Sequence, residues 1–219
     1  MSGGERPRAS GKAGRISAAR IAKQAKWLLI TAMAVPAAIA YFQYCHGIPY
    51  CENDIEALTL DTGQWGVRML MLSLMITPLR DLTGWNWLIT YRRPLGLASF
   101  YYLAAHFAVF LYLDFALDLE FILVELTTSL YVVVGFVAFL LLVPLAVTST
   151  NGWIRALGKK WRILHTLVYG AVFLGVLHYL LQIKEISFWL YLYIILGSVL
   201  LAYRIVKPVW RALSERART

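Results

Sequence analysis

The chain has 219 residues, of which 60% are hydrophobic and only 15% are charged, and its mean hydropathy is +0.63. A soluble globular domain carries roughly 25% charged residues, so this composition excludes an ordinary soluble domain and indicates a membrane protein. The formal charge of +9 would suggest a nucleic-acid partner in a soluble chain. Here the basic residues cluster beside apolar segments, where they orient spans and contact the lipid bilayer, so no nucleic-acid partner is expected.

Six apolar stretches are each close to the length that a bilayer crossing requires. The sequence therefore predicts an all-α integral membrane protein with six transmembrane helices, and no internal repeat is apparent. The six-helix membrane domain covers residues 26–206. Basic tails at 1–25 and 207–219 flank it, and the first tail is expected to be disordered. The predicted spans are about 27–44, 64–79, 94–113, 130–147, 163–183 and 186–203.

The distribution of charge predicts the orientation of these spans. All basic residues except Arg68 and Lys184 fall in the terminal segments 1–26 and 204–219 or in the connections 80–93 and 151–162. Most acidic residues fall in the other connections. Because lysine and arginine are enriched on the cytoplasmic side, both termini are predicted to be cytoplasmic.

Three of the four histidines fall inside predicted spans, and His46 lies just outside the first span. Ionisable side chains within a membrane are costly, so each of the three is a candidate for function. At ~1.5 Å per residue, His106 lies ~18 Å and His178 ~22 Å from the same membrane face, whereas His165 lies only ~3 Å inside it.

A haem bound through two histidines requires imidazoles that face each other at one depth from two helices. His106 and His178 meet this requirement, and we predict that they ligate the iron of haem b. His165 has no histidine opposite it, and on a straight helix it would point ~140° away from His178. Bending at Gly170 or Gly175 would change that angle; otherwise the two histidines have different functions.

Arg68 lies near the outer end of the second span. It either extends its guanidinium to the membrane surface or pairs with a buried anion such as a haem propionate, and the residues alone leave both readings open. The topology places Cys45 and Cys51 in the outer compartment, where a disulfide can form and where redox catalysis by the thiols is not expected.

A series of short motifs follows in order over about residues 60–185. As a set they resemble the MsrQ (YedZ) family, the haem-binding membrane subunit of the periplasmic methionine sulfoxide reductase system, within the ferric-reductase-like transmembrane group. The motifs are Thr62-Gly63-x-Trp65-x-x-Arg68, Ile76-Thr77-Pro78-Leu79-Arg80, Arg92-Arg93-Pro94-Leu95-Gly96-Leu97, His106, Leu145-Ala146-Val147-Thr148-Ser149-Thr150, Leu157-Gly158-Lys159-Lys160-Trp161-x-x-Leu164-His165-x-x-x-Tyr169 and His178-Tyr179.

The resemblance implies an electron-transfer subunit in the bacterial inner membrane, with substrate catalysis in a partner. The partner would be a periplasmic molybdopterin-containing methionine sulfoxide reductase that repairs oxidised periplasmic proteins. Electrons would come from the quinone pool or from a cytoplasmic flavin reductase, and FMN is a further cofactor of the family. His106, His165 and His178 match the family's three functional histidines.

For His165 we predict a position where electrons enter, as the ligand of a second haem or as a hydrogen-bond partner of quinone or flavin. Two other functions compete with electron transfer to a partner. A stand-alone ferric or oxygen reductase is disfavoured because the chain contains no GxGxxG-type dinucleotide motif. A non-redox transporter would use the histidines as a proton or metal path. The sequence departs from the family pattern at 126–131 and 180–184, which affects partner docking rather than haem binding.

Overall fold

The computed structural model describes residues 31–40, 42, 54–182 and 188–216, and every regular element within these ranges is a helix. The predicted all-α class is therefore confirmed. The predicted disorder of 1–25, His46 and the two cysteines lie outside the described residues. The elements are a helix Thr31–Ala40, α2 (Asp54–Thr83), the 3-10 turn η1 (Asn86–Leu88), α3 (Ile89–Val109), the π-helical turn η2 (Phe110–Asp114), α4 (Leu119–Thr128), α5 (Leu130–Val147), α6 (Asn151–Leu157), α7 (Lys159–Leu164), α8 (Leu167–Gln182) and α9 (Phe188–Arg216).

Four helical stretches are long and apolar enough to cross a membrane, and they correspond to the third to sixth predicted spans. The second predicted span lies within α2, which has 30 residues but is less apolar than these four. The first falls on the shorter helix Thr31–Ala40. The count of six spans and the orientation of the termini stay predictions. The four stretches are Asn86–Asp114, Leu130–Val147, Lys159–Gln182 and Phe188–Trp210.

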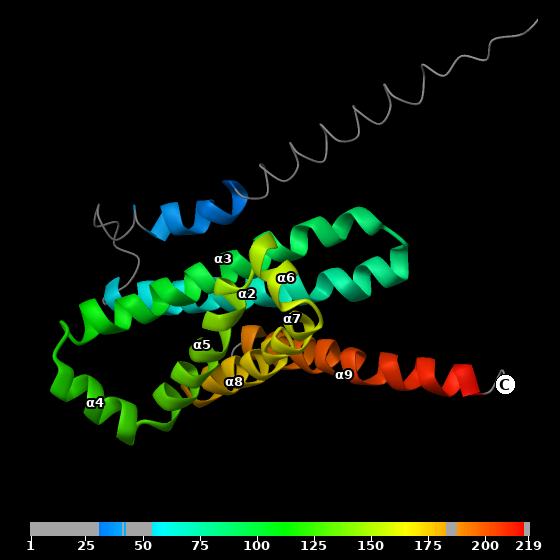
Figure 1. Cartoon of the computed structure of the whole chain (residues 1–219). Coiled ribbons are helices and arrows are strands. Elements are labelled where there is room, and N and C mark those ends of the chain that lie inside the picture. The colour runs from blue at the N-terminus through cyan, green and yellow to red at the C-terminus, as the bar shows by residue number, and fades with distance from the viewer. Residues whose placement is uncertain (1–30, 41, 43–53, 183–187, 217–219) are drawn as a thin grey trace, which may run out of the picture.

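Two helix pairs, α2 with α3 and α5 with α8, form the most extensively packed parts of the molecule (Figure 1). The close approach of α2 and α3 depends on small residues. The hydroxyl of Ser99, which is fully buried, donates to the carbonyl oxygen of Gly66 at 2.8 Å. Small residues at a crossing let two helix backbones approach, and the bond satisfies a polar group that lipid could not. Helix α9 packs against both pairs through α8 and α2.

The fifth predicted span is interrupted rather than bent at its glycines. Helix α7 ends at Leu164 and α8 begins at Leu167, so the break falls at His165 and Thr166. The Thr166 hydroxyl donates to the carbonyl oxygen of Ile163 at 2.7 Å, which offers this backbone an alternative to the helical ladder. Helix α8 then runs without interruption through both Gly170 and Gly175.

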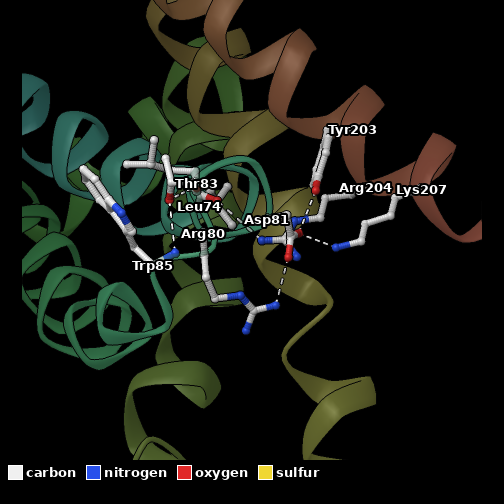
Figure 2. A network of polar contacts seen from close by, with 9 residues as sticks. Leu74, Arg80, Asp81, Thr83, Trp85, Tyr203, Arg204 and Lys207 are labelled. Atoms are coloured by element: carbon white, nitrogen blue, oxygen red, sulfur yellow. Dashed lines mark hydrogen bonds and ion pairs between the residues drawn. The ribbon is translucent and has the colours of Figure 1, made fainter.

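Helix α9 extends well past the predicted end of the sixth span at 203, through the predicted tail to Arg216. A polar network ties this extension to the end of α2 (Figure 2). The Asp81 carboxylate accepts from the Tyr203 hydroxyl at 2.6 Å, pairs with Lys207, and pairs with Arg80 at 3.0 Å. Hydrogen bonds from Lys207 and Tyr203 hold the pKa of Asp81 well below its usual range. We call residues 74–97, 148–165 and 203–209 the basic end, in which Asp81 is the one acidic residue.

Candidate functional site

His106 on α3 and His178 on α8 face each other across the centre of the bundle. Their ring centroids lie 6.1 Å apart, with an interplanar angle of 76°. Two metal–imidazole bonds of about 2 Å, with about 1 Å from each nitrogen to its ring centre, span roughly 6 Å. The separation therefore fits a single metal ion held between the two rings, as in a haem with two axial histidines.

Both rings are oriented by the same kind of hydrogen bond. The Nδ1 atom of His106 lies 2.8 Å from the carbonyl oxygen of Thr59, and Nδ1 of His178 lies 2.7 Å from the carbonyl oxygen of Tyr131. A carbonyl oxygen can only accept, so each Nδ1 carries the proton. The lone pair of each imidazole is thereby left on Nε2, on the far side of the ring from its carbonyl. A histidine that ligates a metal is held in this way by its other nitrogen.

A glycine makes each of these carbonyls accessible. Gly63 follows Thr59 by one helical turn, and Gly135 follows Tyr131 by the same step. A Cβ atom at Gly63 would lie 3.1 Å from Nδ1 of His106, and one at Gly135 would lie 2.6 Å from Nδ1 of His178. Since no side chain covers the carbonyl one turn earlier, the imidazole can approach the backbone of the neighbouring helix.

These positions reveal an internal repeat that the sequence did not show. The two histidines are 72 positions apart, and the same offset relates the residues of the two acceptor carbonyls, Thr59 and Tyr131, and the two glycines. It also relates the buried residues Leu70 and Leu142, each of which is 6% exposed. The α2–α3 pair and the α5–α8 pair thus present equivalent halves of one site.

A cavity of about 580 Å³, which we call the histidine cavity, surrounds the two rings. Its volume falls in the range of about 300–1,000 Å³ that is typical of sites for cofactor-sized ligands. The lining is largely apolar and aromatic, including Phe107 and Phe136, while Glu56 and Asp114 contribute carboxylates. Such a lining suits a large planar apolar ligand, so the described residues fit a haem.

Arg68 lies on α2, beside the histidine cavity rather than among the residues that line it. Its Nε donates to the Tyr193 hydroxyl at 2.9 Å, and one terminal nitrogen donates to the Gln64 side chain at 2.7 Å. The guanidinium also lies over the rings of Trp65 and Trp189, at 4.8 and 4.5 Å from their centroids. Its described partners are all neutral, and two of them, Gln64 and Tyr193, line the cavity.

His165 is held differently from the other two histidines. Its Nε2 lies 3.1 Å from the Thr148 hydroxyl, which itself donates to the carbonyl oxygen of Pro144 at 2.6 Å. The hydroxyl proton is thus committed, so Nε2 of His165 is the donor and its lone pair lies on Nδ1. The ring stacks on Trp161 with 3.9 Å between centroids. It lines a second cavity at the basic end, of about 390 Å³.

Comparison with known proteins identifies the family. Residues 62–176 match the ferric reductase like transmembrane component. The protein-methionine-sulfoxide reductase heme-binding subunit MsrQ of Herminiimonas arsenicoxydans is 49% identical over 128 residues, which cover 58% of this chain and 59% of that relative. MsrQ of Brucella anthropi is 38% identical over 182 residues, which cover 83% of this chain and 82% of the relative. This chain belongs to the MsrQ family. MsrQ of Brucella ovis is 37% identical over 185 residues.

The groups that hold His106 and His178 in place could not be recognised from residue types alone. Gly63 stands in one of the motifs, but Gly135 lies in an apolar run where it carries no visible signal. The carbonyls of Thr59 and Tyr131 belong to the backbone and are invisible to any search for side-chain chemistry. The signal that could have found them is the glycine placed 43 positions before each histidine.

Proposed function

We propose that this chain is a multi-pass b-type cytochrome subunit of the bacterial inner membrane. It would pass electrons to a periplasmic molybdopterin-containing methionine sulfoxide reductase that repairs oxidised periplasmic proteins. The observation that carries the proposal is the facing pair His106 and His178, with both Nδ1 atoms bonded to backbone carbonyls. Membership of the MsrQ family supports it, since the relatives are named as haem-binding subunits of a methionine sulfoxide reductase.

In this proposal, His106 and His178 provide the two axial ligands through Nε2. Haem bound there would accept and release one electron at a time. The chain's own contribution is to fix the two ring tautomers through the Thr59 and Tyr131 carbonyls and to exclude water with an apolar lining. Carbonyl acceptors also make each imidazole a better donor to a metal.

Arg68 is proposed as the partner of a haem propionate. Its two described hydrogen bonds go to the neutral side chains of Gln64 and Tyr193, both on the wall of the histidine cavity. An arginine forms stronger, charge-assisted hydrogen bonds with a carboxylate than with such neutral groups. A propionate reaching this wall would find a fixed cation, whereas the carboxylates of Glu56 and Asp114 would repel it.

His165 is proposed to lie where electrons enter from the cytoplasmic side, from a quinol or from a flavin reductase with FMN. Leu70 and Leu142 line both cavities, so one layer of side chains separates the two. Nδ1 of His165 is available to accept a hydrogen bond from a reduced quinone or flavin, since Nε2 is engaged by Thr148. Its role as the ligand of a second haem stays a prediction.

The proposal is tested by electron transfer in proteoliposomes that contain the purified full chain. A quinol or a flavin reductase with reduced FMN supplies electrons, and the molybdenum-containing partner is added with methionine sulfoxide. We expect haem that has been reduced by the donor to be reoxidised only when partner and sulfoxide are both present. One methionine should form for every two electrons. Reduced haem that stays reduced under these conditions would contradict the proposed partner.

A further inference from the structure

The second cavity, which lies at the basic end, combines a mostly apolar wall with two arginine side chains. It lies between α2, α3, α5 and the α7–α8 break, and most of its wall is apolar. We call it the arginine cavity. Its polar wall consists of Ser73, Arg92, Arg93, Ser149, Trp161 and His165.

The cationic groups of the arginine cavity have no acidic partner. Among the described residues that line it, none is an aspartate or a glutamate. The half-buried guanidinium of Arg92 makes no hydrogen bond or ion pair with any other described residue. Arg93 donates to the neutral amide oxygen of Asn151 at 2.7 Å. A guanidinium carries five donors, and partial burial without a counter-charge is unfavourable, so this wall is suited to an anion.

Neighbouring charges strengthen this preference. Arg80 and Arg204 both repel the charge of Arg92. Asp81, the one carboxylate of the basic end, is already bonded to Tyr203, Lys207 and Arg80, as Figure 2 shows. Among the described residues, no carboxylate that lines the arginine cavity neutralises its guanidinium groups.

The internal repeat shows what distinguishes this cavity from the histidine cavity. The 72-position offset that relates His106 to His178 also relates Arg93 to His165. At the two positions where the histidine cavity has imidazoles, the arginine cavity has the imidazole of His165 and the guanidinium of Arg93. A guanidinium stays protonated and offers no lone pair to a metal. Arg93 therefore gives this position a chemistry suited to an anion rather than to a metal.

We propose that the arginine cavity binds a phosphate group carried on an apolar body, with Arg92 as its principal contact. Arginine suits phosphate because its planar fork presents parallel donors to two oxygens. Apolar residues that include Leu97, Phe100 and Leu145 line the remainder of the cavity and would cover the body. Basic pockets between membrane helices on the cytoplasmic side recognise phospholipid headgroups by this chemistry. The site does not depend on haem in the histidine cavity.

Native mass spectrometry of the purified full chain in detergent tests this site. Phosphatidylglycerol is titrated against a glucosyl diacylglycerol, which lacks phosphate, and inorganic phosphate is titrated separately. The variants are Arg92→Gln and the more conservative Arg92→Lys, with Arg155→Gln as the matched control on α6. Arg155 is exposed, belongs to the same basic end and does not line the cavity. Helix content by circular dichroism verifies that each variant is folded.

We expect wild-type protein to bind the phosphate-bearing probe in preference to the glycolipid. Arg92→Gln should weaken this binding about tenfold or more, because it removes a charge-assisted contact. Arg92→Lys should have an intermediate effect, and Arg155→Gln should stay within about twofold of wild type. Binding of phosphatidylglycerol without inorganic phosphate identifies a lipid headgroup, whereas binding of inorganic phosphate identifies a soluble phosphate ligand. Equal binding by wild type and Arg92→Gln, or an equal loss in Arg155→Gln, would overturn the proposal.

Discussion

The histidine cavity and the arginine cavity both contain histidine, but the ring nitrogen that donates a hydrogen bond differs between them. In the histidine cavity, the Nδ1–H groups of His106 and His178 each donate a hydrogen bond to a backbone carbonyl. In the arginine cavity, the Nε2–H group of His165 donates a hydrogen bond to the hydroxyl of Thr148. The first arrangement leaves the lone pairs of both histidines that line the cavity on Nε2. The second leaves the lone pair of His165 on Nδ1, in a cavity that Arg92 and Arg93 also line.

The difference shows that the hydrogen-bond acceptor of each ring N–H fixes the tautomer of that histidine. All three imidazoles lie in predicted spans, so their type and position alone do not reveal this difference. Carbonyls exposed by Gly63 and Gly135 fix one tautomer. The Thr148 hydroxyl, which itself donates to the carbonyl oxygen of Pro144, fixes the other. The choice of tautomer then decides which nitrogen can bind a metal or accept a proton.

The strongest test of the contrast is removal of each imidazole in turn. His106→Ala and His178→Ala should each lose nearly all haem b, because one axial ligand and its orienting bond disappear. His165→Ala should keep most of it, since its ring lies in the other cavity. The haem-to-protein ratio of the purified protein, together with the α-band after reduction, measures the effect. Equal loss in all three variants would show that the two regions do not differ.

The glycines that expose the carbonyls offer a graded second test. Gly135→Ala places a Cβ atom 2.6 Å from Nδ1 of His178 and should displace that ring, at a cost of about 1–3 kcal/mol. Gly63→Ala places its Cβ atom 3.1 Å from Nδ1 of His106 and should have a smaller effect.

Haem retention during thermal unfolding ranks these variants. Gly197→Ala on α9 is the control, because its nearest atoms, at 3.6 Å, are in normal van der Waals contact. A control variant that loses as much haem as Gly135→Ala would show that the effect is not specific to the histidines.

A third, smaller effect is expected when the partner of His165 is removed. Thr148→Val keeps the shape of the side chain but removes the acceptor of the Nε2 proton. The haem content should not change, whereas the rate of haem reduction by quinol or by flavin reductase should fall several-fold. Stopped-flow absorbance gives both quantities in one preparation. A fall in haem content without a change in rate would reverse the roles assigned to the two cavities.

The smallest effect concerns the carboxylate that holds α9 against α2. Lys207 and Tyr203 lower the folded-state pKa of Asp81, so its contribution to stability is present at neutral pH. That contribution is lost as pH falls below about 4, where the unfolded carboxyl is protonated. Asp81→Asn should lower stability by at most about 1 kcal/mol at pH 7 and flatten the acid dependence. Thermal unfolding from pH 3 to 7 checks this; an unchanged acid profile in Asp81→Asn would contradict it.

The apolar helices were predicted well where their ends coincide with a change in composition. The prediction of 130–147 matches α5, because Ser129 and Thr148 bound an uninterrupted apolar run. Helix α9 was predicted to end near 203 because hydropathy detects the bilayer crossing and not the basic extension to Arg216. The break at His165 was missed, since it depends on Thr166 bonding to the backbone rather than on the nearby glycines.

The side chains of the site could be predicted, whereas their supports could not. His106 and His178 stand out because an ionisable residue in an apolar run is costly. The similar depth predicted for them follows from helical rise alone. The internal repeat escaped notice because only some of its paired positions share a residue type, and others, such as Arg93 and His165, do not. Backbone acceptors leave no trace in composition, so only the structure could identify Thr59 and Tyr131.

The pairing of His106 with His178 is tested most directly by electron paramagnetic resonance of the oxidised, purified protein. Two axial imidazoles predict a low-spin ferric signal in wild type and in His165→Ala. The same signal should be absent from His106→Ala and from His178→Ala. A low-spin signal that survives in either of these two variants, or that disappears only in His165→Ala, would contradict the pairing.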